Sequence, residues 1–506
     1  MAAAPGSWPL RRGNSRNVCP GTCDPVTLLP DLPWFRTRSS PAAPLLAALR
    51  AGRGELALHL PAHGRGRGLA PELRQLLRQP LGRWDLPELP RFGGPLEATG
   101  AVAEAQALAA ELFGAQHCWF GVNGASGLLQ AALLALGQPG DRVLLPRNLH
   151  RSLLHGCVLG GLEPLLYEVP FDPATGLWHP PTAELLERVL QAASAPGLPG
   201  TQAQLPGSRI AALVLVSPTY HGFRADLPPL LAQAQAAGLP VLVDGAHGWG
   251  EALAAGADLE VLSLQKSGGG LAQSAALLSR GERVAVAAIE RALLWLQTSS
   301  PSALLLTSAA AALGHRSSPA GQRQHQRALV LAARLQQALR QRHLPLVETE
   351  DPLRLVLNTA ALGINGLEAD DWLMQRGVVA ELPEPGTLTF CLGTCPPAGL
   401  RRLPQHLAAL RTALGADPAP PFEPPPLPLL ACLELPLAAA WRSPREFVPL
   451  ERACGRIAAE PLCPYPPGIP LLIPGERIDA SRASWLQRQR RLWPGQIADT
   501  VAVVAG

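Results

Sequence analysis

The chain has 506 residues, 47% of them hydrophobic, which is enough for a large core divided among two to four domains. Charged residues make up only 16%, and the net charge of +4 is spread without a basic run, which argues against a nucleic-acid-binding protein. Apolar runs are far shorter than the roughly 20 residues that cross a bilayer, and the first residues lack the apolar segment of a secretory signal, so we expect no membrane span and a cytoplasmic protein.

Residues 1–40, rich in Pro, Arg and Ser, predict a poorly ordered N-terminal segment. Cys19 and Cys23 are spaced CxxxC, as are Cys391 and Cys395, but neither pair has a nearby set of His or Cys partners. We therefore predict reduced thiols and no metal site.

From about residue 95 to 310, short β-rich runs alternate with helical stretches such as 124–137 and 226–239. Near-continuous apolar strands separated by helices predict an α/β fold, with a mostly parallel sheet covered by helices on both faces. Such sheets bind ligands at the carboxyl ends of their strands. The predicted strands are 118–122, 141–146, 163–169, 210–218, 239–246 and 259–265.

The rest of the chain predicts further, smaller units. Residues 321–415 combine a long helical stretch near 320–343 with strand-like DPLRLVLNT and TLTFCLG, which indicates a small α+β domain. Residues 416–430 are a Pro-rich linker, and residues 431–506 form a last α+β unit.

Lys266, in SLQKSGGG, is the single lysine of the chain, and the other 42 of the 43 Lys plus Arg residues are arginine. Arginine forms salt bridges but keeps its protons and is a poor nucleophile, whereas a primary amine can form a Schiff base with a carbonyl such as that of pyridoxal 5'-phosphate (PLP). On composition alone, an accidental surface lysine is about as plausible. The preceding LEVLSLQ lacks the glycines of a P-loop, and the glycines of SGGG would let a ligand approach the backbone.

Polar residues end two other predicted strands. Asp244 ends the strand in LPVLVDGAHG, with His247 one turn later, and a carboxylate there suits a protonated pyridine nitrogen. SPTYHG places Thr219, Tyr220 and His221 at the end of the strand before it. Each alone fits a helix cap or a structural histidine, but residues on successive strands favour a site.

FGVNGASGLL is a strand, a Gly/Ser turn and a helix, and it predicts an anion site at a helix N-terminus. The backbone N–H groups of Ala125, Ser126 and Gly127 and the Ser126 hydroxyl would hold a phosphate, although such a turn is common. His150, just past the next strand end, could stack on a flat ring or belong to a solvent-exposed loop.

The ordered motifs VNGASG, LLPRNLHRS, SPTYHG, DGAHG, SLQKSGGGLAQSA, LQTSSPSALLL and PYPPGIPLLIPGE resemble the fold-type-I, PLP-dependent ornithine/lysine/arginine decarboxylases. The similarity runs from about residue 41 to 490 and is to a short form without the N-terminal receiver-like domain.

The resemblance implies that residues 41–94, including HLPAHGRGRG (59–68), contribute to the active site and dimer, and that residues 95–320 bind PLP. Lys266 would carry the cofactor as a Schiff base, Asp244 would pair with its pyridine nitrogen, and Thr298 and Ser299 would reach the cofactor of a neighbouring subunit in a homodimer or larger homo-oligomer. The other implied cofactor contacts are His150 and Ala246 on the two faces of the ring, with Ala125, Ser126, Gly127, Thr219, Ser263 and Gln265 around it.

The chain departs from the family pattern at four positions, one of which is Leu264, where the family usually has Thr. Gln265 stands where the family usually has His, which removes a cationic contact of the kind worth about 1.5–3 kcal/mol. Gly245 replaces Glu in Asp-Glu-Ala-His, and Ala125 replaces Thr in NGTS.

We therefore expect α-decarboxylation of a basic amino acid: arginine, lysine or ornithine. Lys266 or His247 would return a proton to the α-carbon, and Glu476 in the C-terminal PGE would bind the distal cation of the substrate. Two alternatives stay open. One is another fold-type-I reaction, such as that of an aminotransferase, with Arg354 holding the α-carboxylate, or of an aldolase; the other is a catalytically weakened regulatory homologue.

Overall fold

The computed structural model describes residues 42–51, 54–195, 209–464, 468–493 and 496–506. The predicted N-terminal segment 1–40, with Cys19 and Cys23, lies outside these residues. The chain divides into two units, residues 1–54, which contain helix α1 (Ala43–Ala51), and residues 55–506. All elements named below belong to the second unit.

An eight-stranded sheet organises the larger part of this unit, in the order β16-β4-β3-β7-β8-β9-β10-β2. Neighbours from β4 to β9 are parallel, whereas β10 runs antiparallel between β9 and β2. The α/β class and all predicted strands are confirmed, but the sequence pattern did not indicate β10. The strands are β2 (His117–Gly121), β3 (Arg142–Pro146), β4 (Glu163–Tyr167), β7 (Ile210–Val216), β8 (Val241–Asp244), β9 (Leu259–Ser263), β10 (Ala275–Ser279) and β16 (Leu430–Ala431).

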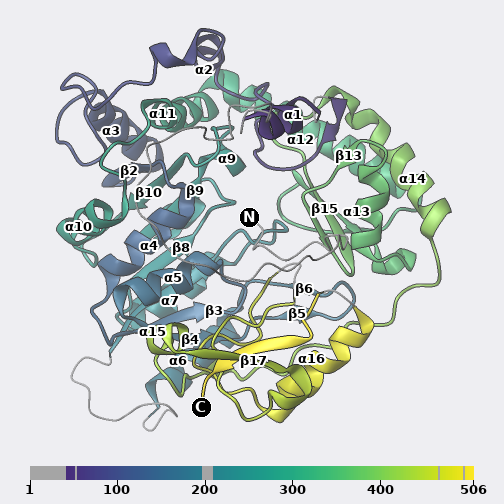
Figure 1. Cartoon of the computed structure of the whole chain (residues 1–506). Coiled ribbons are helices and arrows are strands. Elements are labelled where there is room, and N and C mark those ends of the chain that lie inside the picture. The colour runs from purple at the N-terminus through teal and green to yellow at the C-terminus, as the bar shows by residue number, and fades with distance from the viewer. Residues whose placement is uncertain (1–41, 52–53, 196–208, 465–467, 494–495) are drawn as a thin grey trace, which may run out of the picture. The chain divides into compact units, whose positions relative to one another are not determined.

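Helices cover both faces of this sheet (Figure 1). Side chains alternate along each strand, so Val143 and Leu145 pack into one core with α4, α5 and α10, while Leu144 packs into another with α6 and α7. A third core joins α3 and α11 to β2 and β10. The helices are α3 (Ala101–Phe113), α4 (Gly124–Leu136), α5 (Arg151–Gly160), α6 (Ala183–Ser194), α7 (Leu227–Ala236), α8 (Glu251–Ala255), α10 (Val286–Leu296) and α11 (Ala303–Ser317).

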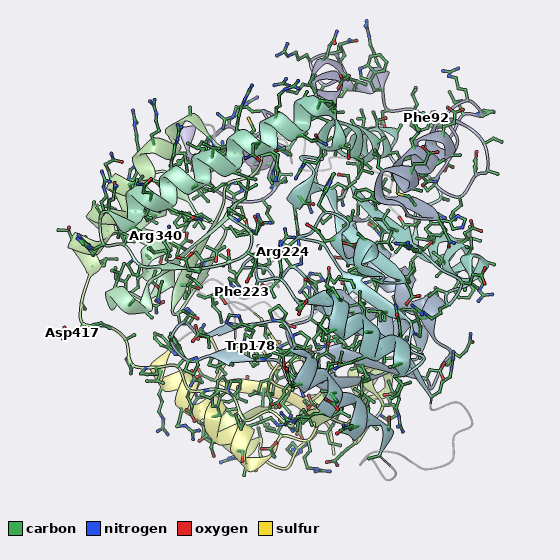
Figure 2. All side chains as sticks on the ribbon, turned by 180° about the vertical axis from the view of Figure 1, so that it is seen from behind. Phe92, Trp178, Phe223, Arg224, Arg340 and Asp417 are labelled. Atoms are coloured by element: carbon green, nitrogen blue, oxygen red, sulfur yellow. The ribbon has the colours of Figure 1, made fainter. Side chains whose placement is uncertain are left out.

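A smaller α+β group follows α12 (Pro319–Arg340), and Figure 1 shows it beside the large sheet. Its four-stranded sheet has the order β11-β12-β15-β14, and β1 pairs with β13 at its side. Phe223, labelled in Figure 2, packs with Leu177 of β6 and Val356 of β12 and so joins the two sheets. The elements of this group are β1 (Leu56–Ala57), β11 (Leu346–Val347), β12 (Arg354–Asn358), α13 (Gly366–Met374), β13 (Val378–Val379), β14 (Leu382–Glu384), β15 (Thr387–Cys391) and α14 (Leu403–Leu414). Strands β5 (Phe171–Asp172) and β6 (Leu177–Trp178) form a separate two-stranded sheet, and α2 (Pro71–Leu76) packs against α11.

The Pro-rich connector leaves α14 near Asp417 (Figure 2) and packs along the molecule. The N–H of Phe422 donates to Pro173, and β16 then becomes the edge strand of the large sheet by pairing with β4. The last unit contains α15 (Leu437–Arg442), β17 (Arg445–Pro449), α16 (Ala480–Leu492) and β18 (Thr500–Val504). Within the described ranges, no helix is both long and apolar enough to cross a membrane.

Candidate active site

The predicted site residues meet at one edge of the large sheet. The register places Val216 of β7 beside Asp244 of β8, and Asp244 beside Val261 of β9, so these three strands end together. Thr219, Asp244 and Ser263 are all buried at this edge. This is the carboxyl edge at which parallel sheets bind ligands.

Lys266 lies on the short helix α9 (Leu264–Ser267), directly after β9. Its Nζ is 3.0 Å from Nε2 of His247 and 5.8 Å from the centre of the Tyr220 ring. Burial lowers the pKa of Lys266, and the nearby Asp244 carboxylate acts in the opposite direction. The single lysine is therefore a side chain of the site, not a leftover surface residue.

Asp244 is the last residue of β8 and is buried. One oxygen accepts the N–H of Ala246 at 3.1 Å, and the other accepts no hydrogen bond from the described residues. Burial raises the pKa of this carboxyl. A buried carboxylate with a free oxygen fits a cationic partner such as a protonated ring nitrogen.

His150 is the N-cap of α5, where Nδ1 accepts the N–H of Ser152 at 3.3 Å and lies 2.8 Å from its hydroxyl. Burial, followed by the charge of Lys266, lowers the pKa of His150 to about 3. The imidazole is therefore neutral, which suits a ring that lies against a flat cofactor.

The N-terminus of α4 supplies a phosphate cradle with one donor that the sequence pattern did not indicate. The side chain of Asn123 does not cap this helix, so the N–H groups of its first turn at Ala125 and Ser126 have no intrahelical partner, whereas that of Gly127 is the first within reach of a helix carbonyl, at Asn123. The Nε2 of Gln297, just after α10, is buried without a partner in the described structure and lies 3.4 Å from where a Cβ on Gly127 would stand. An unpaired donor beside a free helix N-terminus fits a phosphate group. Gln297 belongs to the motif LQTSSPSALLL, but the motif did not indicate it as a phosphate donor, because the packing of α10 on α4 brings it there.

The segment 59–68 reaches the lysine, as the sequence indicated. The N–H of Ala62 donates to the carbonyl of Gln265 at 2.8 Å, so this segment lies against α9. Two glycines after Lys266 are packed too closely against other parts of the chain to carry a side chain. A Cβ on Gly269 would stand 2.7 Å from the carbonyl oxygen of Gly68, and one on Gly270 would stand 2.5 Å from Oγ of Ser274. Close packing of the chain is therefore a sufficient reason for both glycines, and the approach of a ligand to this segment stays a prediction.

The small sheet adds charged side chains to the site. The Nη2 of Arg354, on β12, is 3.1 Å from Nδ1 of His247. Glu381 accepts hydrogen bonds from the Tyr220 hydroxyl and from the N–H of Leu60, and it is close enough to Lys266 to affect its pKa. The buried His221 instead bonds Glu384 at 2.5 Å. The sequence suggested Arg354 only for an alternative reaction and gave no indication of Glu381.

Glu476 does not belong to this group, and its predicted role in substrate binding is wrong. Its carboxylate is buried and bonds Arg147 through both oxygens, at 2.7 and 3.0 Å, and Arg482 at 2.8 Å. The N–H of Ile473 donates the fourth hydrogen bond, at 2.7 Å. The four acceptor positions of the carboxylate are thus filled, and none is left for a substrate cation. Thr298 and Ser299 are exposed, and their reach into a neighbouring subunit stays a prediction.

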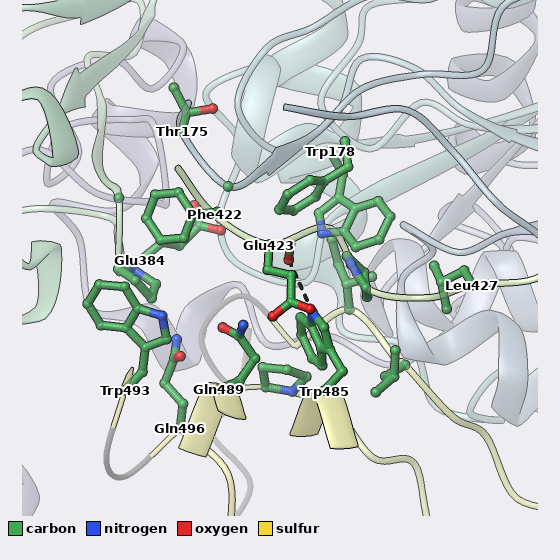
Figure 3. Close-up of a pocket in the computed structure, with 18 of the residues that line it drawn as sticks. Thr175, Trp178, Glu384, Phe422, Glu423, Leu427, Trp485, Gln489, Trp493 and Gln496 are labelled. Atoms are coloured by element: carbon green, nitrogen blue, oxygen red, sulfur yellow. Dashed lines mark hydrogen bonds between the residues drawn. The ribbon is translucent and has the colours of Figure 1, made fainter. Parts of the chain in front are cut away.

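A separate pocket lies between β6, the turn at Pro385 and Gly386, and the C-terminal unit (Figure 3). Its walls include Phe422, stacked on Trp493 with ring centres 5.7 Å apart, and Trp485, whose indole donates to the carbonyl of Glu423. None of the predicted site residues lines it. It marks the junction of three parts of the chain and is distinct from the Lys266 site.

Fold and site together define an enzyme of the fold-type-I class, in which a lysine after a strand of the large sheet faces an aspartate on the neighbouring strand. Solved structures share this fold. The structure of lysine decarboxylase A from Pseudomonas aeruginosa is 19% identical, with a TM-score of 0.68 over 86% of this chain and 77% of that one. A structure described as SPT with PLP is 18% identical, with a TM-score of 0.53 over 71% of this chain and 89% of that one.

Sequence comparison identifies the family within this class. The family described as Orn/Lys/Arg decarboxylase matches with its major domain at residues 43–355 and with its C-terminal domain at residues 437–495. The arginine decarboxylase of Bacillus subtilis is 31% identical over 88% of this chain and 92% of its own length, and that of Bacillus anthracis is 30% identical over the same shares. The chain belongs to the Orn/Lys/Arg decarboxylase family and is an amino-acid decarboxylase; enzymes of this family depend on PLP in general.

Proposed function

We propose that the protein is a PLP-dependent decarboxylase that removes the α-carboxylate of a basic amino acid. The observation that carries this proposal is the position of the single lysine, Lys266, beside the buried Asp244 at the carboxyl edge of the large sheet. The unpaired donor of Gln297 over the N-terminus of α4 supports the phosphate end of the same site.

PLP, when bound, supplies an electron sink that stabilises negative charge at the α-carbon of an amino acid. The amine of Lys266 would hold it covalently, Asp244 would keep a proton on its ring nitrogen, and His150 and Ala246 would lie against its faces. The phosphate would lie at the first turn of α4, with Ser126 and Gln297 as donors and Ser263, Thr219 and Gln265 nearby. Lys266 and His247, which already share a hydrogen bond, would deliver the proton that replaces carbon dioxide at the α-carbon.

Lys266→Arg tests this proposal, because arginine keeps the charge but cannot attack a carbonyl. Borohydride treatment of the wild type with PLP should attach one cofactor to the peptide that contains Lys266, and the variant should take up none and lose carbon dioxide release by on the order of a thousandfold or more. Peptide mass spectrometry and a carbon dioxide assay measure the two effects. Arginine is the first substrate to test, since the relatives matched over most of the chain are named arginine decarboxylase.

Arg334→Lys is the matched control, because it adds a second lysine on the exposed side of α12. This lysine should stay unlabelled at stoichiometric PLP. Cofactor uptake by Lys266→Arg equal to that of the wild type would remove the basis of the proposal.

Glu381 takes the place of Glu476 as the candidate for the distal cation of the substrate. It is a carboxylate of the Lys266 cluster, and Tyr220 and Leu60 occupy only part of its acceptor capacity. Glu381→Gln should raise KM for the preferred basic amino acid by about 10- to 100-fold, because a charge-assisted hydrogen bond is lost, while kcat falls less. Steady-state kinetics with arginine, lysine and ornithine measure this, and an unchanged KM for all three would exclude the assignment.

Transamination is a second candidate function, and the position of Arg354 beside His247 in the site favours it. An arginine of the small domain could hold the α-carboxylate and so prevent its loss. The same incubation separates the two reactions, since transamination yields a keto acid and decarboxylation yields carbon dioxide. The family membership favours decarboxylation.

A further inference from the structure

Three side chains from three different elements form a row of hydrogen bonds in the site. The Nη2 of Arg354, on β12, lies 3.1 Å from Nδ1 of His247. The Nε2 of the same imidazole lies 3.0 Å from the Nζ of Lys266, on α9. The loop after β8 thus places His247 between the two cationic residues.

The guanidinium fixes the tautomer of the imidazole. Arginine has only donors and does not lose its protons, so Nδ1 of His247 must be the acceptor in this contact. An imidazolium carries a proton on both nitrogens and would face Arg354 donor to donor. Burial, together with the charge of Arg354, also holds the pKa of His247 well below its ordinary value. His247 is therefore neutral, with its single proton on Nε2.

The imidazole in turn selects the protonation state of the lysine. With its proton on Nε2, His247 is the donor toward Lys266, and the acceptor must be a lone pair on Nζ. An ammonium group has three protons and no lone pair, whereas a neutral amine has one. Only the neutral amine satisfies all contacts in the row, and the neutral amine is the form that attacks a carbonyl.

Other charged and titratable groups surround the row and act on its protons. Asp244 and Glu381 face Lys266 and favour its charged form, whereas Arg354 and burial oppose it and lower its pKa. His221 and His150 also lower the pKa of His247, and the ring of Tyr220 lies edge-on to it with centres 4.8 Å apart. The buried thiol of Cys391 lies close enough to affect the pKa of both Lys266 and Arg354.

We infer that Arg354 is a positioning residue, which holds the proton of His247 on Nε2 and thereby keeps Lys266 as a free amine, ready to take up a carbonyl cofactor. This inference deepens the proposed function and rests on it, because a free amine is useful here only if Lys266 binds a carbonyl cofactor. The protonation state itself belongs to the chain without cofactor, and it can be measured there.

The single lysine makes the measurement direct. The full-length chain, produced with lysine carrying carbon-13 at Cε and freed of cofactor, has only one lysine signal, and the pH dependence of its shift reports the protonation of Lys266. Because burial lowers the pKa of Lys266, we expect a midpoint below the ordinary 10.5. A midpoint near 10.5 would overturn the inference.

A double-mutant cycle separates the hydrogen-bond row from a simple charge effect. Arg354→Met should raise the midpoint by about 1 or more in the wild type, because the imidazole is then free to place its proton on Nδ1, and by much less in a His247→Phe background. An equal rise in both backgrounds would mean that Arg354 acts only through its charge and would overturn the inference.

Nitrogen-15 histidine spectra of the wild type report the tautomer of His247 directly. The signal of His247, assigned as the one missing in His247→Phe, should show the proton on Nε2 across the neutral range, and a proton on Nδ1 would contradict the inference. These measurements contain no PLP, so they test the protonation of Lys266 independently of cofactor binding. The failure of this inference and the failure of the proposed function can therefore be distinguished.

Discussion

At the scale of single residues, the side chain of Glu260 occupies the space that a side chain at position 245 would need, which explains Gly245. A Cβ on Gly245 would stand 2.7 Å from Oε1 and 2.9 Å from Cγ of Glu260, which lies buried on β9 and accepts the N–H of Leu253. The family pattern has Glu at the position of Gly245, and a side chain there would overlap Glu260 of the neighbouring strand. The Gly245 departure therefore has a structural reason, and it does not by itself indicate a weakened enzyme.

Glu260→Gln should change how stability depends on pH. Burial raises the pKa of Glu260 from 4.5 to about 7, so the folded state binds the proton more tightly than the unfolded state. The contribution of this group to stability is complete below pH 4.5 and is lost as pH rises through about 7. The neutral glutamine has no such loss, so the variant should gain up to roughly 3 kcal/mol relative to the wild type between pH 5 and 8.

Urea unfolding at several pH values measures this difference. Glu72→Gln, on the exposed side of α2, is the control and should follow the wild type. A constant difference between Glu260→Gln and the wild type across this range would show that Glu260 is ionised throughout.

At the scale of elements, the packing of α10 on α4 builds the phosphate end of the site. Leu128 and Leu129 of α4 share a core with Ile289 and Leu293 of α10. This contact fixes where α10 ends and so brings Gln297 over the first turn of α4. The resemblance had named Thr298 and Ser299 in this stretch, but within the chain itself the donor beside Gly127 is Gln297.

Gln297→Leu should weaken PLP binding by about 10- to 100-fold, because a hydrogen bond to a charged group is worth about 1.5–3 kcal/mol. Fluorescence titration of the cofactor-free protein with PLP gives this Kd. Gln233→Leu is the matched control, since Gln233 lies on α7 and bonds the carbonyl of Ala183 instead. Equal Kd values for Gln297→Leu and the wild type would place the phosphate elsewhere.

At the scale of the whole second unit, separate parts of the chain meet around the site. The small sheet brings Arg354 and Glu381 to Lys266, and the C-terminal unit brings Glu476 to Arg147, three residues before His150. Arg147 also donates to the carbonyls of Pro470 and Leu471, at 3.3 Å each. The C-terminal unit thus supports the loop that carries His150 without contributing Glu476 to the chemistry.

Glu476→Gln should loosen the C-terminal unit. It leaves the buried Arg147 without its carboxylate, and breaking such a pair costs about 3–5 kcal/mol. Hydrogen exchange in residues 468–493 should become faster, while KM for the substrate stays unchanged. Glu434→Gln removes the exposed partner of Arg477 and should cost less than about 1 kcal/mol. A raised KM with normal exchange in Glu476→Gln would restore its role as a substrate ligand.

The class of fold and the centre of the site are both predictable from the amino-acid sequence. The strands that end at Val216, Asp244 and Ser263 are apolar runs with clear boundaries, and parallel strands bring their ends to one edge. Asp244 ends one of these strands, and His247 and Lys266 follow two of them within three residues, so the sequence pattern is sufficient to group them. The single lysine among 42 arginines indicates the chemistry, and the ordered motifs indicate the family.

The side chains that complete the site depend on tertiary packing. The sequence PGE gives no sign that Glu476 is occupied, but its carboxylate bonds Arg147, which lies 329 residues earlier in the chain. Arg354 contacts His247 across a separation of 107 residues. Strand β10 is a short apolar run whose place between β9 and β2 depends on pairing with both. Local sequence patterns follow the periods of helices and strands, whereas hydrogen bonds between distant residues depend on how the elements pack. For that reason Gln297, Glu381 and the Arg354–His247–Lys266 row are recognisable only in the folded chain.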